Sequence, residues 1–102
     1  MGDAMTEREE LQASLVKYGV PSHIHDSLIG YVVDHARVGG FLRAVLSNDL
    51  SWSFAAADPE NVAHLHDIVK WLGNETPHDC RGSTRKVDAW LAQRPAAAEV
   101  HE

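Results

Sequence analysis

The sequence predicts an all-α fold, a compact bundle of five or six short helices. Apolar residues recur three and four positions apart along most of the chain, the spacing that places them on one face of a helix. No segment alternates apolar and polar residues over the length of a strand, and no Asn-Gly or Asp-Gly pair marks a hairpin. Glycines, prolines and helix-capping residues separate the apolar stretches. These three observations indicate helices joined by short turns.

The first predicted helix follows Thr6 and ends at Gly19. Thr6 and Glu9 form a capping-box pattern, and a glycine at a helix end can adopt the left-handed conformation. The second helix begins after Ser22, which can act as its cap, and ends at the Gly39-Gly40 pair. The residues expected to face the core from these two helices are Leu11, Leu15, Tyr18, Ile24, Leu28, Tyr31, Val32 and Ala36.

The third predicted helical segment spans residues 41–57. Its apolar face is expected to consist of Leu42, Val45, Leu46, Leu50 and Phe54. Ser47, Asn48 and Asp49 interrupt this segment, and short polar side chains compete for backbone hydrogen bonds within a helix. We therefore expect a kink or a restart here, with Ser47 or Asn48 capping the second piece.

Two more helices are predicted before the C-terminus. Asp58-Pro59-Glu60-Asn61 is a strong start signal, because aspartate caps a helix and proline suits its first turn. This helix should end at Gly73-Asn74. Ser83 should cap the last helix, which Pro95 terminates. The residues expected to face the core are Val62, Leu65, Ile68, Val69, Leu72, Val87, Trp90 and Leu91.

Length and composition indicate one domain. The chain has 102 residues, of which 44% are hydrophobic, enough for a single modest core. We expect the domain to span residues 6–94, with flexible ends at residues 1–5 and 95–102. Apolar runs are far shorter than a membrane span, and the N-terminus lacks a signal pattern, so no membrane association and a cytoplasmic location are expected.

The charge pattern argues against broad nucleic-acid binding. The net charge is −6, whereas sequence-independent binding to DNA requires a basic surface that neutralises phosphates. The one basic stretch contains Arg81, Arg85, Lys86 and Arg94 and is a candidate contact for an acidic group. Cations near the C-terminus of a helix are also common without any such function.

No pattern of catalytic or metal-binding residues stands out. His23-x-His25 and His64-x-His66 place their rings about 200° apart on a helix, unlike the i, i+3 or i+4 spacing of helical metal ligands. Cys80, the single cysteine, lies two residues after His78, and such neighbours seldom point at each other. No phosphate-binding loop or nucleophile motif occurs. The sequence therefore predicts no enzyme activity, no metal and no cofactor.

Trp52 and Trp71 each lie at the edge of an apolar stripe. An exposed tryptophan beside another aromatic residue is typical of a protein-binding anchor. Alternatively, each indole fills a groove between two helices inside the core. Both interpretations remain open from the sequence.

Four segments resemble a group of small helical proteins of bacteriophages, prophages and related mobile elements. These segments are Gly40-Phe41-Leu42 with residues 44–50, Ala57-Asp58-x-x-Asn61, Ile68-Val69-x-Trp71-Leu72-x-Asn74-Glu75-x-Pro77 and Gly82-Ser83-x-x-Lys86-Val87-x-Ala89-Trp90. The resemblance covers roughly residues 20–91. It implies an accessory protein without an enzyme activity or cofactor of its own.

The resemblance suggests inhibition of a bacterial defence complex in the host cytoplasm, as anti-CRISPR proteins do. A small acidic protein can occupy a basic channel of a host complex such as a CRISPR effector by electrostatic complementarity. The acidic residues expected to form that contact are Asp26, Asp34, Asp58, Glu60 and Asp67. The alternative is a regulatory DNA-binding or adaptor module, acting as a homodimer, that uses the basic stretch around Arg85 and Lys86.

Overall fold

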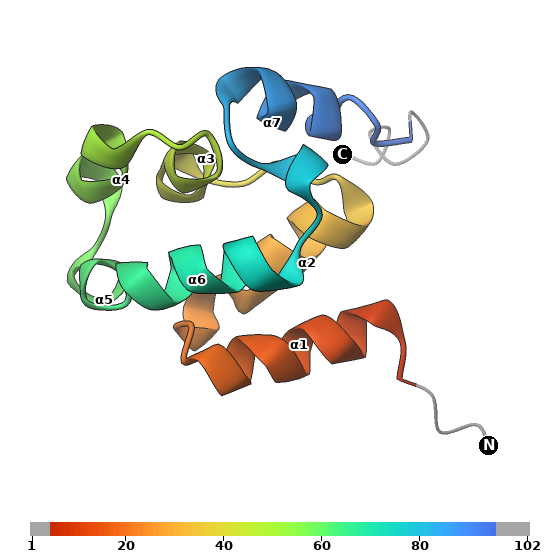
Figure 1. The fold of residues 1–102 in the computed structure, drawn as a ribbon, viewed down its shortest axis with the longest axis horizontal. Helices are drawn as coiled ribbons and strands as arrows, with labels where there is room; N and C mark the ends of the chain where they lie inside the picture. The colour runs from red at the N-terminus through yellow and green to blue at the C-terminus, as the bar shows by residue number, and fades with distance from the viewer. Residues whose placement is uncertain (1–4, 96–102) are drawn as a thin grey trace.

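The computed structural model describes residues 5–95, which form seven α-helices and two short 3-10 helices and contain no strand (Figure 1). The α-helices are α1 (Glu7–Tyr18), α2 (His25–Asp34), α3 (Gly40–Leu46), α4 (Leu50–Ala56), α5 (Pro59–Ala63), α6 (Leu65–Glu75) and α7 (Thr84–Leu91), and the 3-10 helices are η1 (Ser22–Ile24) and η2 (His78–Cys80). The all-α class is confirmed. The flexibility predicted for residues 1–4 and 96–102 concerns segments outside the described residues. Within residues 5–95, no helix combines the length and the apolar character that crossing a bilayer requires.

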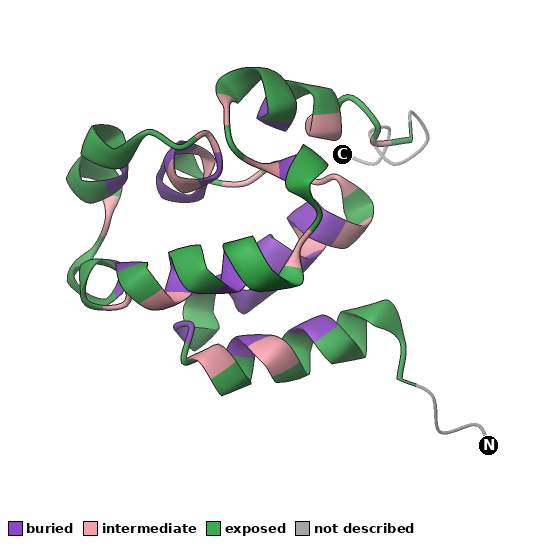
Figure 2. Cartoon of the chain, viewed as in Figure 1, coloured by how far each residue is buried: buried purple, intermediate pink, exposed green. Residues whose placement is uncertain are grey.

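One hydrophobic core holds the helices together. Helix α1 packs against α2 and α6, and α3 packs against α4 and α7. The largest fully buried side chains come from α1, α2, α3, α6, η2 and α7. They are Leu15, Leu28, Tyr31, Leu46, Ile68, Trp71, Cys80 and Val87. In Figure 2 the buried residues lie on the inward sides of these elements, whereas α4 is almost wholly exposed.

The caps predicted at the ends of α1 are confirmed. The Glu9 amide donates to Thr6 Oγ1 over 3.1 Å, and the Thr6 amide donates to Glu9 Oε1 over 2.9 Å. Gly19 ends the helix at φ 78°, where its N–H bonds the carbonyls of Leu15 and Val16. A side chain is strained at this φ, so the glycine is required.

The caps predicted for two later helices are also confirmed. The Asn61 amide donates to the Asp58 carboxylate over 2.7 Å at the start of α5. The Lys86 amide donates to Ser83 Oγ over 3.1 Å at the start of α7. Local capping patterns therefore fix these two boundaries without help from distant residues.

The restart predicted between Ser47 and Asp49 is confirmed, but a different residue caps the second piece. Asn48 has a left-handed φ of 65°, and the Asp49 carboxylate accepts from the Trp52 amide over 3.0 Å. Asp49 is thus the N-cap of α4, in place of Ser47 or Asn48. Asparagine tolerates the left-handed region better than most residues, which explains why the chain turns there.

The helix predicted after Asp58 is divided in two and ends later than expected. His64 leaves the helical region, with φ −113° and ψ 17°, and separates α5 from α6. Its Nδ1 lies 3.1 Å from the Asp67 carboxylate in the first turn of α6, a local pairing that favours a new helix start. Helix α6 continues through the predicted stop at Gly73-Asn74 to Glu75. Residues 5–95 therefore contain seven α-helices, where five or six were predicted.

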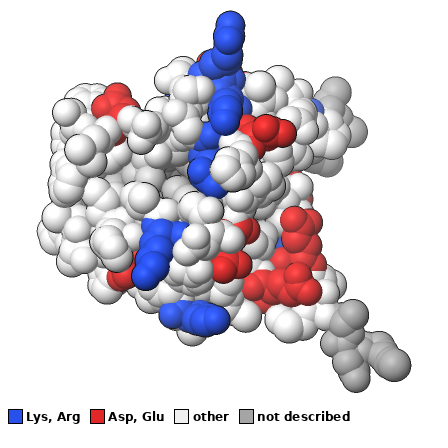
Figure 3. Space-filling model, viewed as in Figure 1, with Lys and Arg blue, Asp and Glu red and all other residues white. Residues whose placement is uncertain are grey.

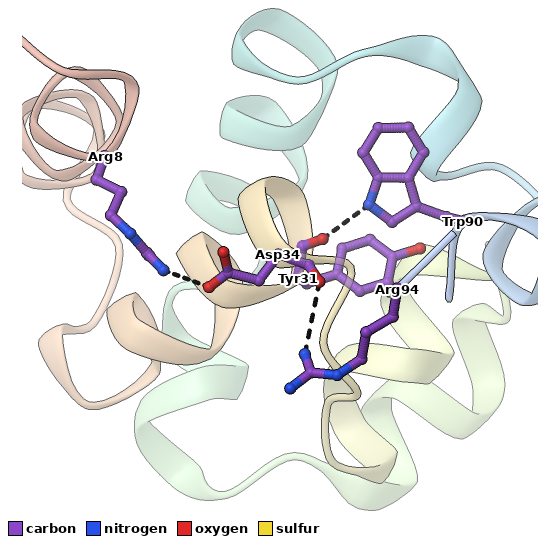
Figure 4. A network of polar contacts seen from close by, with 5 residues as sticks. All are labelled: Arg8, Tyr31, Asp34, Trp90 and Arg94. Atoms are coloured by element: carbon purple, nitrogen blue, oxygen red, sulfur yellow. Dashed lines mark hydrogen bonds and ion pairs between the residues drawn. The ribbon is translucent and has the colours of Figure 1, made fainter. Parts of the chain in front are cut away.

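Helix α2 ends at Asp34, well before the predicted stop at Gly39-Gly40, because α7 binds its C-terminal backbone (Figure 4). Trp90 Nε1 donates to the Tyr31 carbonyl over 2.7 Å. His35 adopts a left-handed φ of 56°, and its Nδ1 donates to the Trp90 carbonyl over 2.9 Å. The His35 amide also donates to the Tyr31 carbonyl, over 3.1 Å, so a local cap and a distant tryptophan meet at the same helix end.

Two arginines strengthen this helix end (Figure 4). Arg8 of α1 pairs with the Asp34 carboxylate, and Arg94 makes a long contact of 3.5 Å with the Asp34 carbonyl. Cations near a helix C-terminus interact favourably with its dipole. The end of α2 thus links α1 to the segment that follows α7.

The bond between Trp90 and Tyr31 leads to a stability prediction. Replacement Trp90→Phe keeps an aromatic ring beside Tyr31 and His35 but removes the N–H donor. The Tyr31 carbonyl keeps the bond from the His35 amide, so the variant loses one hydrogen bond, and we expect a loss of about 0.5–1.5 kcal/mol in the free energy of unfolding. Urea denaturation followed by circular dichroism measures it. Trp52→Phe is the matched control, since Trp52 is exposed. Equal stability of the two variants would contradict the prediction.

Candidate protein-interaction surface

An apolar groove of about 690 Å³ lies between α4 on one side and α5 with α6 on the other. Its walls are formed by Leu50, Phe54, Val62, Ala63, Leu65, His66, Val69 and Lys70. Five of these residues were predicted to face the core: Leu65 is buried as predicted, but the prediction is wrong for the other four. The exposed fractions are 68% for Leu50, 49% for Phe54, 43% for Val62 and 52% for Val69.

The break at Asn48 explains the exposure of Leu50 and Phe54. The prediction continued one apolar stripe from α3 into α4, which requires an unbroken helix. The left-handed Asn48 rotates α4, so that Ser53 is the residue of α4 that becomes buried. Its hydroxyl donates to the Asp49 carbonyl over 2.6 Å, which satisfies the polar group inside the fold.

The core stripe of α6 is narrower than predicted. Leu65, Ile68 and Leu72 are buried at spacings of three and four residues. Val69 follows Ile68 by one residue and therefore lies about 100° away around the helix. Val62 precedes the break at His64, and it too points outward. Both valines therefore line the groove.

The structure separates the two candidate tryptophans. Trp71 is fully buried, and its Nε1 donates to Ser14 Oγ of α1 over 2.8 Å. It therefore fills the space between α6 and α1, and the interpretation as an exposed anchor is wrong. Trp52 remains 63% exposed on α4. It lies two residues from Leu50, about 200° around the helix, and thus on the side of α4 away from the groove.

Four of the five predicted acidic contact residues pair with arginine or histidine side chains within the fold. Asp58 and Glu60 lie around His23, at 3.2 Å and 3.4 Å from its ring nitrogens. Asp67 pairs with the His64 ring. Asp34 pairs with Arg8 at the other end of α2 from Asp26. Eight residues of helix separate those two aspartates by about 12 Å.

The basic stretch is partly engaged in contacts within the fold. Arg81 donates from Nε to Thr76 Oγ1 over 3.2 Å and from Nη2 to the Gly73 carbonyl over 3.3 Å. Lys86 Nζ donates to the His78 carbonyl over 3.4 Å. Arg85 is exposed on α7. Arg81 and Lys86 therefore hold the chain around η2 through these contacts.

A second hollow, of about 470 Å³, lies between the α2–α3 connection and α7. Arg37, Arg43 and Arg94 line it, a set that could attract an anion. Arg43, however, pairs with Asp88 over 2.6 Å, and Arg94 contacts the end of α2. Most of its positive charge is therefore already used within the fold.

The residues considered for nucleophilic or metal chemistry are not brought together. Cys80 is fully buried in η2, and burial raises the pKa of its thiol. Its carbonyl accepts a 2.6 Å hydrogen bond from the Tyr31 hydroxyl, which holds η2 against α2. Among residues 5–95, no three His, Cys, Asp or Glu side chains lie close enough to hold a metal ion. The contacts of Cys80 are those of a structural residue.

In comparisons with protein families, curated proteins and solved structures, no match to this chain was found.

The burial of Cys80 predicts slow alkylation. A thiol reacts as the thiolate, and both burial and a raised pKa reduce the thiolate that a reagent can reach. At about pH 8 we expect iodoacetamide to modify the folded chain at least tenfold more slowly than the chain in urea. Mass spectrometry over time measures both rates. Similar rates with and without urea would contradict the burial of this residue.

Proposed function

We propose that the chain acts by stoichiometric binding of a partner protein, one helix of which lies in the apolar groove between α4 and α6. The exposure of Leu50, Phe54, Val62 and Val69 along one groove carries this proposal. Large connected apolar patches are rare on proteins that function alone and mark interaction sites. An amphipathic helix can insert side chains from successive turns into such a groove.

The shape of the groove favours a protein segment over a small molecule. A bound small molecule usually has 70–90% or more of its surface covered by its pocket. Here the four apolar wall residues keep about half of their own surface exposed, so the groove is open along its length. Helix α4 contains no charged residue, and Trp52 adds an exposed aromatic surface on its other side. A partner that covers α4 would therefore bury apolar surface on both sides.

The resemblance to proteins of mobile elements suggests the kind of partner. We propose that the chain is a phage or mobile-element accessory protein that inhibits a bacterial defence complex, such as a CRISPR effector, in the host cytoplasm. Its effect would come from covering a surface of that complex rather than from catalysis. The groove is better suited to this contact than the acidic residues, most of which are paired within the fold, because it joins several apolar side chains in one place.

A matched pair of valines tests the groove. Val69 lies in the groove and Val16 on the outer side of α1, and both are exposed helix residues. We expect Val69→Asp to weaken binding to the partner by tenfold or more, because a carboxylate would enter an apolar contact, while Val16→Asp has no effect. Both variants should retain the circular dichroism spectrum and melting temperature of the parent chain.

The experiment passes lysate of a bacterium that carries several defence systems over the immobilised parent chain and both variants. The proposal requires a protein that the parent and Val16→Asp retain and Val69→Asp loses, and that then binds in a fixed ratio when purified. Equal retention by all three chains would place binding elsewhere. Loss of self-association in Val69→Asp, measured by sedimentation, would identify a second copy of this chain as the occupant and overturn the proposal.

A further inference from the structure

The apolar groove continues along α6 as a longer valley. A smaller hollow of about 160 Å³ lies between α3 and α6 and extends to Arg81 and Gly82 after η2. Val69 lines both this hollow and the groove, so the two are adjacent. Leu46 and Leu72 continue the apolar floor. The valley therefore offers a partner an apolar path from α5 toward η2.

The two charged side chains that line this valley are both cations. The groove is lined by Lys70 and His66, and the smaller hollow by Arg81. Among the described residues, no carboxylate lines either part, although the whole chain has a net charge of −6. On the face shown in Figure 3, basic side chains lie from the top to the middle and again toward the bottom, while the largest acidic group lies at the lower right.

The two cations differ in how they are held. Arg81 is fixed by its bonds to Thr76 and the Gly73 carbonyl. Lys70 is exposed and makes no ion pair with another described residue. One end of the valley thus has a positioned guanidinium, and its side has a free ammonium group that can reach a bound segment.

We propose that the segment bound in the valley is an acidic amphipathic helix, with carboxylates beside its apolar face. This inference rests on the proposed function and specifies its partner. Lys70 would pair with one carboxylate, and Arg81 would attract a second toward η2. A basic helix would instead place like charges against both cations, and like-charge contacts reduce affinity and exclude wrong partners.

The net negative charge of the chain does not exclude an acidic helix as its partner. At about 0.15 M ionic strength, charges more than about 8 Å apart are largely screened, so groups in direct contact with the bound helix dominate. The two charged side chains that line the valley, Lys70 and Arg81, are positive, and Asp67 approaches it only through His66, at 3.8 Å from its Nδ1. The acidic residues paired with His23, Arg8 and His64 lie outside its lining.

Two synthetic helical peptides test the inference with the intact chain. Both carry leucines on one face over roughly four turns, and they differ only in having glutamate or lysine beside that face. An NMR titration at about 0.15 M salt gives their affinities, because it detects complexes as weak as about 1 mM. We expect the glutamate peptide to bind the parent chain about three- to tenfold more tightly than the lysine peptide. Amide chemical shifts should change in α4 and α6.

Charge reversal at Lys70, with Lys17 as the control, locates the effect. Both lysines are exposed, and Lys17 lies on α1 outside the valley. We expect Lys70→Glu to abolish or reverse the preference for the glutamate peptide and Lys17→Glu to leave it unchanged. Equal binding of both peptides to the parent chain would overturn the inference that the partner helix is acidic, while the groove would still stand as a helix-binding site. Binding of neither peptide would overturn the groove as a helix site, and with it the proposed function.

Discussion

The left-handed turn at Asn48 is the constraint on which the exposed surface depends. It rotates α4 relative to α3, so the buried face of α3 does not continue into α4, and Ser53 points inward in place of Leu50 or Phe54. The Leu46 carbonyl just before this turn accepts a 2.7 Å hydrogen bond from the Gly82 amide after η2. The position of α4, and with it one wall of the groove, is therefore tied to the C-terminal part of the chain.

The opposite wall depends on contacts that hold α6. Trp71 is buried against α1, and its hydrogen bond to Ser14 defines how α6 is rotated about its axis. With this rotation fixed, Ile68 points into the core and Val69 out of it. The Trp90 bond to the end of α2 and the Tyr31 bond to η2 hold the remaining helices around the same core. The groove is thus a consequence of rigid packing on both sides.

The sequence predicts the local features of this fold and misses those that depend on distant residues. The side chains of Thr6, Asp58 and Ser83 each accept a hydrogen bond from an amide three residues later, so these caps can be predicted from local sequence alone. The end of α2 depends on Trp90, more than fifty residues away, and no local signal marks it. The groove was missed because apolar spacing predicts a common buried face only for residues on one unbroken helix, and the predicted helices are broken at Asn48 and His64. One sequence signal could have indicated the groove: the segment that forms α4 has no charged residue to mark a solvent-facing side.

The groove alone provides too little binding free energy for a tight complex, so a partner must extend beyond it. Fully burying a valine, leucine or phenylalanine contributes about 1.5–3 kcal/mol, and four residues already half-buried offer roughly half of that each, about 4 kcal/mol in all. A micromolar complex requires about 8 kcal/mol after the entropic costs of association have been met. Trp52 offers further apolar surface on the other side of the same helix. A partner that encloses α4 from both sides would bury Trp52 together with the groove, and this argues for α4 as the centre of the interface rather than its edge.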